Sequence, residues 1–80
     1  MHFVKDFKYI NDYRLNITFE NGVQKEVDLK SYIGGGIFEP LRNVDYFKRV
    51  KFNPDIDTIY WENGADLAPD FLYEIGKSPE

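Results

Sequence analysis

Four carboxylates in the last third of the chain form its densest group of potentially reactive side chains: Asp55, Asp57, Glu62 and Asp66. Hard cations such as calcium prefer oxygen ligands, and paired carboxylates can serve as general acid and base inside a cleft. An EF-hand loop is excluded, because Tyr60 stands at the sixth position from Asp55, where that loop needs glycine. Turn formation and helix capping also explain these acids. We therefore predict no metal and no cofactor, and keep Glu62 and Asp66 as candidates for a small enzyme.

Nucleophilic catalysis needs a nucleophile, a base and an orienting group within hydrogen-bond reach. Ser31 and Ser78 have no histidine beside them, and the single histidine, His2, follows Met1, where a solvated side chain is expected. Three glycines at residues 34–36 could present amides to a phosphate. No Lys-Ser/Thr pair follows them, so a backbone that needs positive φ explains the run better than a P-loop does. The sequence therefore predicts that the chain is not an enzyme.

Charge is divided unevenly along the chain, whose net charge is −4. Residues 1–52 hold nine basic and seven acidic side chains, whereas residues 53–80 hold one and seven. The basic side chains that could contact nucleic-acid phosphates are Arg42, Lys48, Arg49 and Lys51. Nucleic-acid-binding domains normally carry a domain-wide basic excess, so a solvated strand edge is the simpler interpretation. The acidic end suits a basic partner protein, with candidate contact residues Tyr60, Glu62, Asp66, Asp70 and Tyr73.

Hydrophobic periodicity predicts the elements that would position these side chains. Apolar and polar residues alternate over residues 13–19, which is typical of a strand buried on one face. The following Asn21-Gly22 favours a tight hairpin in which both residues have positive φ, with a return strand over residues 23–27. Residues 3–10 predict a preceding strand. The chain thus begins with a three-stranded antiparallel meander.

The rest of the chain predicts short helical turns, a second hairpin and a closing helix. Asp28 is placed to cap a helical turn over residues 29–33, and two further short turns follow. Residues 49–52 and 58–61 predict the second hairpin. Pro69 suits the first position of a helix that ends at Gly76. The fold class is therefore α+β, in the order βββαββα.

Eighty residues predict a single small domain over residues 1–76, with a frayed tail over residues 77–80. The 14 aromatic residues are needed for the core, since a chain this short buries only about 60% of its unfolded surface. We predict that Trp61 points inward and Tyr60 to the opposite face. The absence of cysteine fits a reducing compartment, and no apolar run is long enough for a membrane span. We expect a cytoplasmic protein.

Two segments of the chain have similar sequences. Residues 17–23 and 59–65 share the pattern Ile-x-aromatic-Glu-Asn-Gly-aliphatic. A duplicated unit would give this pattern, but turns of this kind also recur independently at strand ends, and that is the simpler explanation.

The pattern Tyr-x-Leu-x-Ile-x-Phe-x-Asn-Gly over residues 13–22 and the later Trp-x-Asn-Gly-Ala-Asp-Leu-Ala-Pro over residues 61–69 resemble a bacterial family, domain of unknown function 2442. The resemblance covers nearly the whole chain, and the tryptophan segment is its most specific part. It implies the same small α+β fold and provides no catalytic residues. Members of that family are often encoded beside another small protein, which implies a toxin–antitoxin-like pairing.

Taken together, these observations favour a non-enzymatic domain that binds a small partner protein through an uncovered sheet edge or the acidic terminal helix. A DNA-binding regulator that uses the basic residues is the alternative, and a small enzyme that uses Glu62 or Asp66 is a third hypothesis. Self-association through an edge strand is also open.

Overall fold

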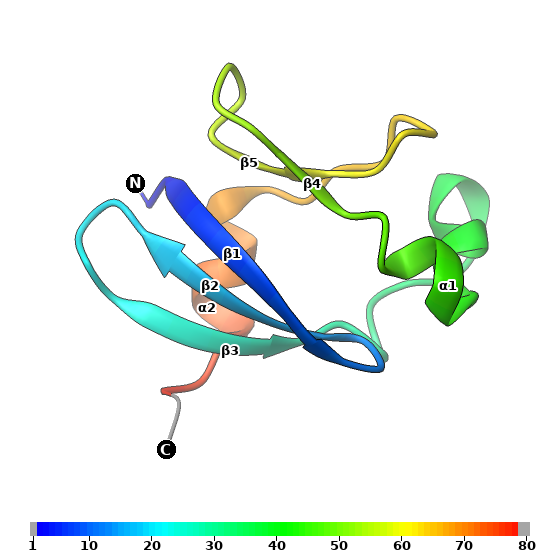
Figure 1. Ribbon diagram of the computed structural model, residues 1–80, viewed down its shortest axis with the longest axis horizontal. Coiled ribbons are helices and arrows are strands. Elements are labelled where there is room, and N and C mark those ends of the chain that lie inside the picture. The colour runs from blue at the N-terminus through cyan, green and yellow to red at the C-terminus, as the bar shows by residue number, and fades with distance from the viewer. Residues whose placement is uncertain (1, 79–80) are drawn as a thin grey trace.

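The computed structural model describes residues 2–78, which form strands and short helices around one core (Figure 1). In chain order the elements are β1 (Val4–Asn11), β2 (Arg14–Phe19), β3 (Gln24–Asp28), the 3₁₀ helix η1 (Gly36–Arg42), α1 (Val44–Phe47), β4 (Lys51–Asn53), β5 (Thr58–Tyr60) and α2 (Pro69–Ile75). The strands β1, β2 and β3 form an antiparallel meander, and β4 and β5 form a separate antiparallel pair. The predicted α+β class and its three-stranded sheet, second hairpin and terminal helix are confirmed.

The meander buries one face and leaves the other to solvent. On β2, Leu15, Ile17 and Phe19 are fully buried, while Asn16 and Thr18 between them are half-buried. This alternation follows from the pleat of a strand, which sends successive side chains to opposite faces. The helix α2 covers the buried face, behind the sheet in Figure 1. Its Tyr73 ring packs edge-on against Phe19, with ring centroids 4.9 Å apart.

The hairpin between β2 and β3 has a three-residue loop. The Phe19 N–H donates to the Val23 carbonyl at 2.9 Å, and the Gly22 N–H donates to the Phe19 carbonyl at 2.9 Å. Gly22 has a φ of 87°, but the prediction of positive φ at Asn21 is wrong. The Asn21 side chain instead accepts the Val23 N–H at 3.0 Å. A three-residue loop needs positive φ only at its last position, which is where Gly22 stands.

The second Asn-Gly segment adopts the same turn. The Trp61 N–H donates to the Ala65 carbonyl at 2.8 Å, and the Gly64 N–H donates to the Trp61 carbonyl at 2.9 Å. Gly64 has a φ of 94°, and the Asn63 side chain accepts the Ala65 N–H at 3.0 Å. The likeness between the two segments is therefore a likeness of turn chemistry, carried by equivalent Asn and Gly residues.

The turn predicted over residues 29–33 is present and is capped by Asp28, but it does not extend into a helix. The Tyr32 N–H donates to the Leu29 carbonyl at 2.9 Å, which makes one tight turn and no helix. The Asp28 carboxylate accepts the Lys30 N–H at 3.0 Å, so it does make a hydrogen bond with a following amide, but it closes a local turn. Gly34 and Gly35 then have positive φ, so a right-handed helix cannot continue from this turn. The two short turns predicted next are confirmed as η1 and α1.

Trp61 fills the centre of the core, as predicted. Its side chain is fully buried, and its indole Nε1–H donates to the Phe47 carbonyl at 3.0 Å. The two rings are in contact, with centroids 5.5 Å apart. Tyr60, the preceding residue, is half-buried. The hydrogen bond ties the strand pair β4–β5 to the end of α1.

The end of α2 is fitted closely against β3. Gly76 has a φ of −70°, so its conformation does not require glycine. A Cβ atom at this position would lie 2.8 Å from the Lys25 Cβ and 3.0 Å from the Leu72 carbonyl oxygen, so the close approach requires glycine. Lys77 was expected in the frayed tail, but its backbone N–H and C=O both pair with Glu26, at 2.9 and 2.7 Å. Ser78 follows in an exposed position, and the last two residues of the predicted tail, 79–80, lie outside the described residues.

Candidate functional site

The outer side of β1 is a sheet edge that has no paired strand, although β1 contacts β5. Along its other side β1 pairs with β2 from Val4 to Asn11, with irregularities at Lys5 and Ile10. On the outer side, the Val4 N–H donates to the Asp57 carbonyl at 3.0 Å. Within residues 2–78 we find no other backbone–backbone hydrogen bond on that side. We refer to the outer side of residues 6–10 as the β1 edge.

The register of the sheet shows which backbone groups the β1 edge presents. Glu26 uses its N–H and C=O to bind Lys77, so these groups point away from β2. Hydrogen bonding alternates along antiparallel strands, so Asn16, which is paired with Glu26, turns its backbone groups toward Lys8 on β1. The neighbours of Lys8, which are Phe7 and Tyr9, therefore direct their N–H and C=O groups outward.

A side-chain contact supports this assignment. The Phe7 N–H donates to the carboxylate of Asp6 at 2.8 Å, which a hydrogen bond to β2 would prevent. Asp6 and Lys8 are exposed, and they share the solvent-facing side of the sheet with Thr18 and Asn16, the residues they pair with. Phe7 and Tyr9 are half-buried against the core. The β1 edge thus has a charged outer face and an aromatic inner face.

The opposite edge of the sheet is partly covered. Lys77 forms an antiparallel bridge with Glu26, so the chain after α2 occupies the middle of the β3 edge. Lys25, beside it, donates from its ammonium to the Tyr73 carbonyl at 2.7 Å and lies 3.8 Å from the centroid of the Tyr73 ring. A strand that reached the β3 edge would have to displace this segment. The β1 edge is therefore the more accessible of the two.

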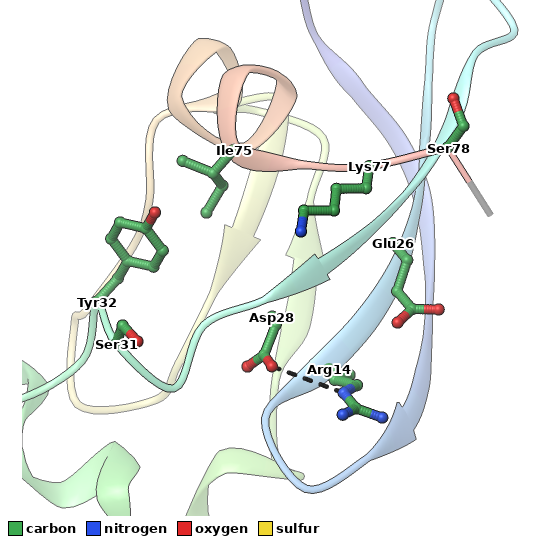
Figure 2. A pocket seen from close by; sticks show the side chains of 8 residues that line it. All are labelled: Arg14, Glu26, Asp28, Ser31, Tyr32, Ile75, Lys77 and Ser78. Atoms are coloured by element: carbon green, nitrogen blue, oxygen red, sulfur yellow. Dashed lines mark ion pairs between the residues drawn. The ribbon is translucent and has the colours of Figure 1, made fainter.

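Beside the β3 edge lies an open hollow of about 630 Å³ (Figure 2). Its lining residues come from the sheet, the turn after β3, the last residue of α2 and the chain after it: Arg14, Glu26, Asp28, Ser31, Tyr32, Ile75, Lys77 and Ser78. Arg14 and Asp28 form an ion pair across its floor, with Nε and Oδ2 3.6 Å apart. Both side chains are about half exposed, so solvent screens this pair. His2 lies outside the hollow, stacked on Tyr73 with ring centroids 3.6 Å apart.

The acidic candidate residues already have partners within the domain. The Glu62 carboxylate accepts from Arg49 at 3.0 Å, and the Asp70 carboxylate accepts the His2 N–H at 2.7 Å. Asp66 is exposed and pairs through its backbone with Tyr60. Neither Glu62 nor Asp66 lines the hollow. Among residues 2–78, no three His, Asp or Glu side chains come together as a metal site.

Tyr73 was predicted to contact a partner protein, but its ring is already in contact with other side chains of the domain. It is half-buried, and its ring has Lys25 over it and His2 stacked on it. Its third neighbour is Phe19, which it meets edge-on. The ring therefore holds the terminal helix to the sheet.

The basic candidate residues are spread over three elements. Arg42 ends η1 and lies against Gly34, and Lys51 is exposed on β4. Lys48 and Arg49 follow α1: Lys48 lies 5.8 Å from the Tyr9 ring centroid, and the Arg49 charge is paired with Glu62. Of the four, Lys48 lies nearest to the β1 edge through its contact with Tyr9.

A family model described as "Protein of unknown function (DUF2442)" matches residues 4–78, nearly the whole chain. The chain belongs to the DUF2442 family. No curated protein and no solved structure matches it. In the described part of this DUF2442 chain, no helix is long and apolar enough to cross a membrane.

The description of the DUF2442 family names no function. Sequence reasoning raised the possibility of an uncovered edge without identifying the strand, and it passed over Asp6, Phe7 and Lys8. Their signal was present in the alternation of charged and aromatic residues over residues 6–9, which is typical of an edge strand. Choosing β1 over β3 needed the knowledge that Lys77 returns to pair with Glu26.

Proposed function

We propose that this DUF2442 chain is a non-enzymatic, cytoplasmic protein-interaction module that accepts an extended strand of a small partner protein at the β1 edge. The observation that carries the proposal concerns the backbone of Phe7 and Tyr9. The N–H and C=O groups of these residues point away from β2 and have no backbone partner within residues 2–78. An exposed edge of this kind is a template for strand addition, in which main-chain hydrogen bonds supply affinity.

The flanking side chains define which strand would fit. In an added strand, side chains opposite Phe7 and Tyr9 would face the aromatic inner side, and side chains opposite Asp6 and Lys8 would face solvent. An alternating apolar and charged strand meets both requirements. The partner we propose is a small protein encoded beside this one, as in a toxin–antitoxin pair.

The placement of the reactive side chains supports a role in binding. Ser31 and Ser78 line the hollow beside β3, whereas His2 stacks on Tyr73 outside it. Glu62 is held in an ion pair with Arg49. These candidate nucleophiles, bases and acids serve different local contacts.

A matched pair of variants tests the proposal. Phe7→Pro and Phe7→Ala both remove the half-buried ring, but only Phe7→Pro removes the outward N–H and places a ring carbon on the β1 edge. Proline is tolerated on an edge strand when its nitrogen faces solvent. Tagged wild type and both variants would be used as bait in an extract of the native cell, after circular dichroism has confirmed that each is folded.

The expected result is a stoichiometric protein that the wild type and Phe7→Ala retain and Phe7→Pro loses. Equal retention by both variants would mean that the partner binds elsewhere. Failure of the folded wild type to retain any stoichiometric protein would count against an interaction module altogether.

A further inference from the structure

We infer that the β1 edge also binds a second copy of this chain, with the two β1 strands antiparallel about a two-fold axis at Phe7. The inference deepens the proposed function and rests on it, because both use the same backbone groups. It makes the partner protein and the second copy competitors for one edge. Three features of the β1 edge carry it: the outward backbone groups, the charges on the outer face and the aromatic ring on the inner face.

The backbone groups of Phe7 suit self-pairing. Because its N–H and C=O both point outward, Phe7 of one copy can exchange two hydrogen bonds with Phe7 of the other. In the single chain the Phe7 N–H is held by the Asp6 carboxylate at 2.8 Å. Pairing would transfer this N–H to a carbonyl and release the Asp6 carboxylate. The released carboxylate then needs a cation nearby.

The charges on the outer face provide that cation. With the axis at Phe7, Asp6 of each copy lies directly opposite Lys8 of the other, so the dimer contains this pair twice. Both side chains are exposed and lie on the same face of the sheet. The pairs that flank a hydrogen-bonded pair are non-hydrogen-bonded, with Cα atoms about 4.5 Å apart and side chains close together. The edge is therefore complementary in charge to its own two-fold copy.

The aromatic inner face also favours the register centred on Phe7, and the contact between Val4 and Asp57 limits its length. The half-buried Phe7 rings of the two copies would meet as a cross-strand aromatic pair, which stabilises antiparallel strands. A register centred on Lys8 would place two lysines opposite each other, which is destabilising. Beyond Lys5 the Val4 N–H is taken by Asp57, which ends the ladder. The interface is consequently short, and the dimer should be concentration-dependent.

Charge exchange at two positions tests the inference. Sedimentation equilibrium at low ionic strength would be measured for the wild type, Asp6→Lys, Lys8→Asp and the double variant with both changes. Each single variant places like charges opposite each other twice, and the double variant restores opposite charges with the wild-type net charge. Controls matched in net charge are Glu20→Lys for the first single variant and Lys30→Asp for the second, at exposed positions away from the β1 edge.

The wild type, both controls and the double variant should dimerise, and each single variant should weaken dimerisation by at least about fivefold. A wild type that stays monomeric at its highest soluble concentration would overturn the inference and leave the proposed function to the Phe7→Pro test. Single variants that dimerise as well as the wild type would place the interface elsewhere. Loss of dimerisation in the double variant would overturn the register at Phe7.

Discussion

Replacing Trp61 with phenylalanine tests whether the centre of the core is fixed by one hydrogen bond as well as by volume. The indole is fully buried and donates to the Phe47 carbonyl at 3.0 Å. Loss of a buried hydrogen bond costs about 0.5–1.5 kcal/mol. The Phe47 carbonyl keeps the Val50 N–H at 3.2 Å, so it is not left without a donor. The smaller ring adds a cavity term, and we expect a total of about 1–3 kcal/mol.

Urea unfolding followed by far-ultraviolet circular dichroism measures this change without relying on tryptophan fluorescence. A domain of this size should have a free energy of unfolding of about 4–12 kcal/mol, and Trp61→Ala should remove about 3–5 kcal/mol of it. The matched control is Tyr60→Phe on the half-buried neighbour, with an expected change within about 0.5 kcal/mol. A Trp61→Phe protein as stable as the wild type, or a control that loses as much stability, would refute the reasoning.

Three further changes have defined outcomes. Gly76→Ala should lower the midpoint of thermal unfolding by several degrees, because the new Cβ would lie 2.8 Å from the Lys25 Cβ; an unchanged midpoint would contradict the close fit. Asn63→Asp should lower the free energy of unfolding, measured in urea, by about 0.5–1.5 kcal/mol. It keeps the oxygen that accepts the Ala65 N–H but loses the amide that donates to the Ile37 carbonyl of η1 at 2.8 Å, and Asn63→Ala, which loses both, should lower it further. A double-mutant cycle on the exposed Arg49–Glu62 pair should give a coupling below about 1 kcal/mol that falls with added salt, and a larger, salt-independent coupling would contradict its exposure.

Local patterns predicted most of the fold because they are decided by residues close in sequence. The alternation over residues 13–19 determined the central strand, and Pro69 fixed the start of the last helix. The segment at residues 29–33 was predicted as a helical turn and forms a single turn without a helix, because Gly34 and Gly35 follow it with positive φ. The hairpin after β2 was predicted with Asn21 and Gly22 as its two central residues, but its loop has three residues. The difference arises because Asn-Gly suits more than one type of hairpin turn.

The site was less predictable from the sequence, because a sheet edge is free only if no other part of the chain pairs with it. Whether β1 or β3 is free depends on Lys77, which is 51 residues from Glu26 in the chain and was expected to fray. Tyr73 was a candidate for an exposed contact, yet contacts with Lys25 and His2 hold it within the domain. No local pattern encodes such long-range contacts.

Hydrogen–deuterium exchange at the Phe7 and Tyr9 amides tests the central claim most directly. These N–H groups point away from β2, and in the free monomer they should exchange faster than the Lys8 amide, which pairs with Asn16. In the complex with the retained partner, both outward amides should become protected because they join a new ladder. Unchanged exchange at both amides, with protection gained at another surface of the domain, would contradict strand addition at the β1 edge.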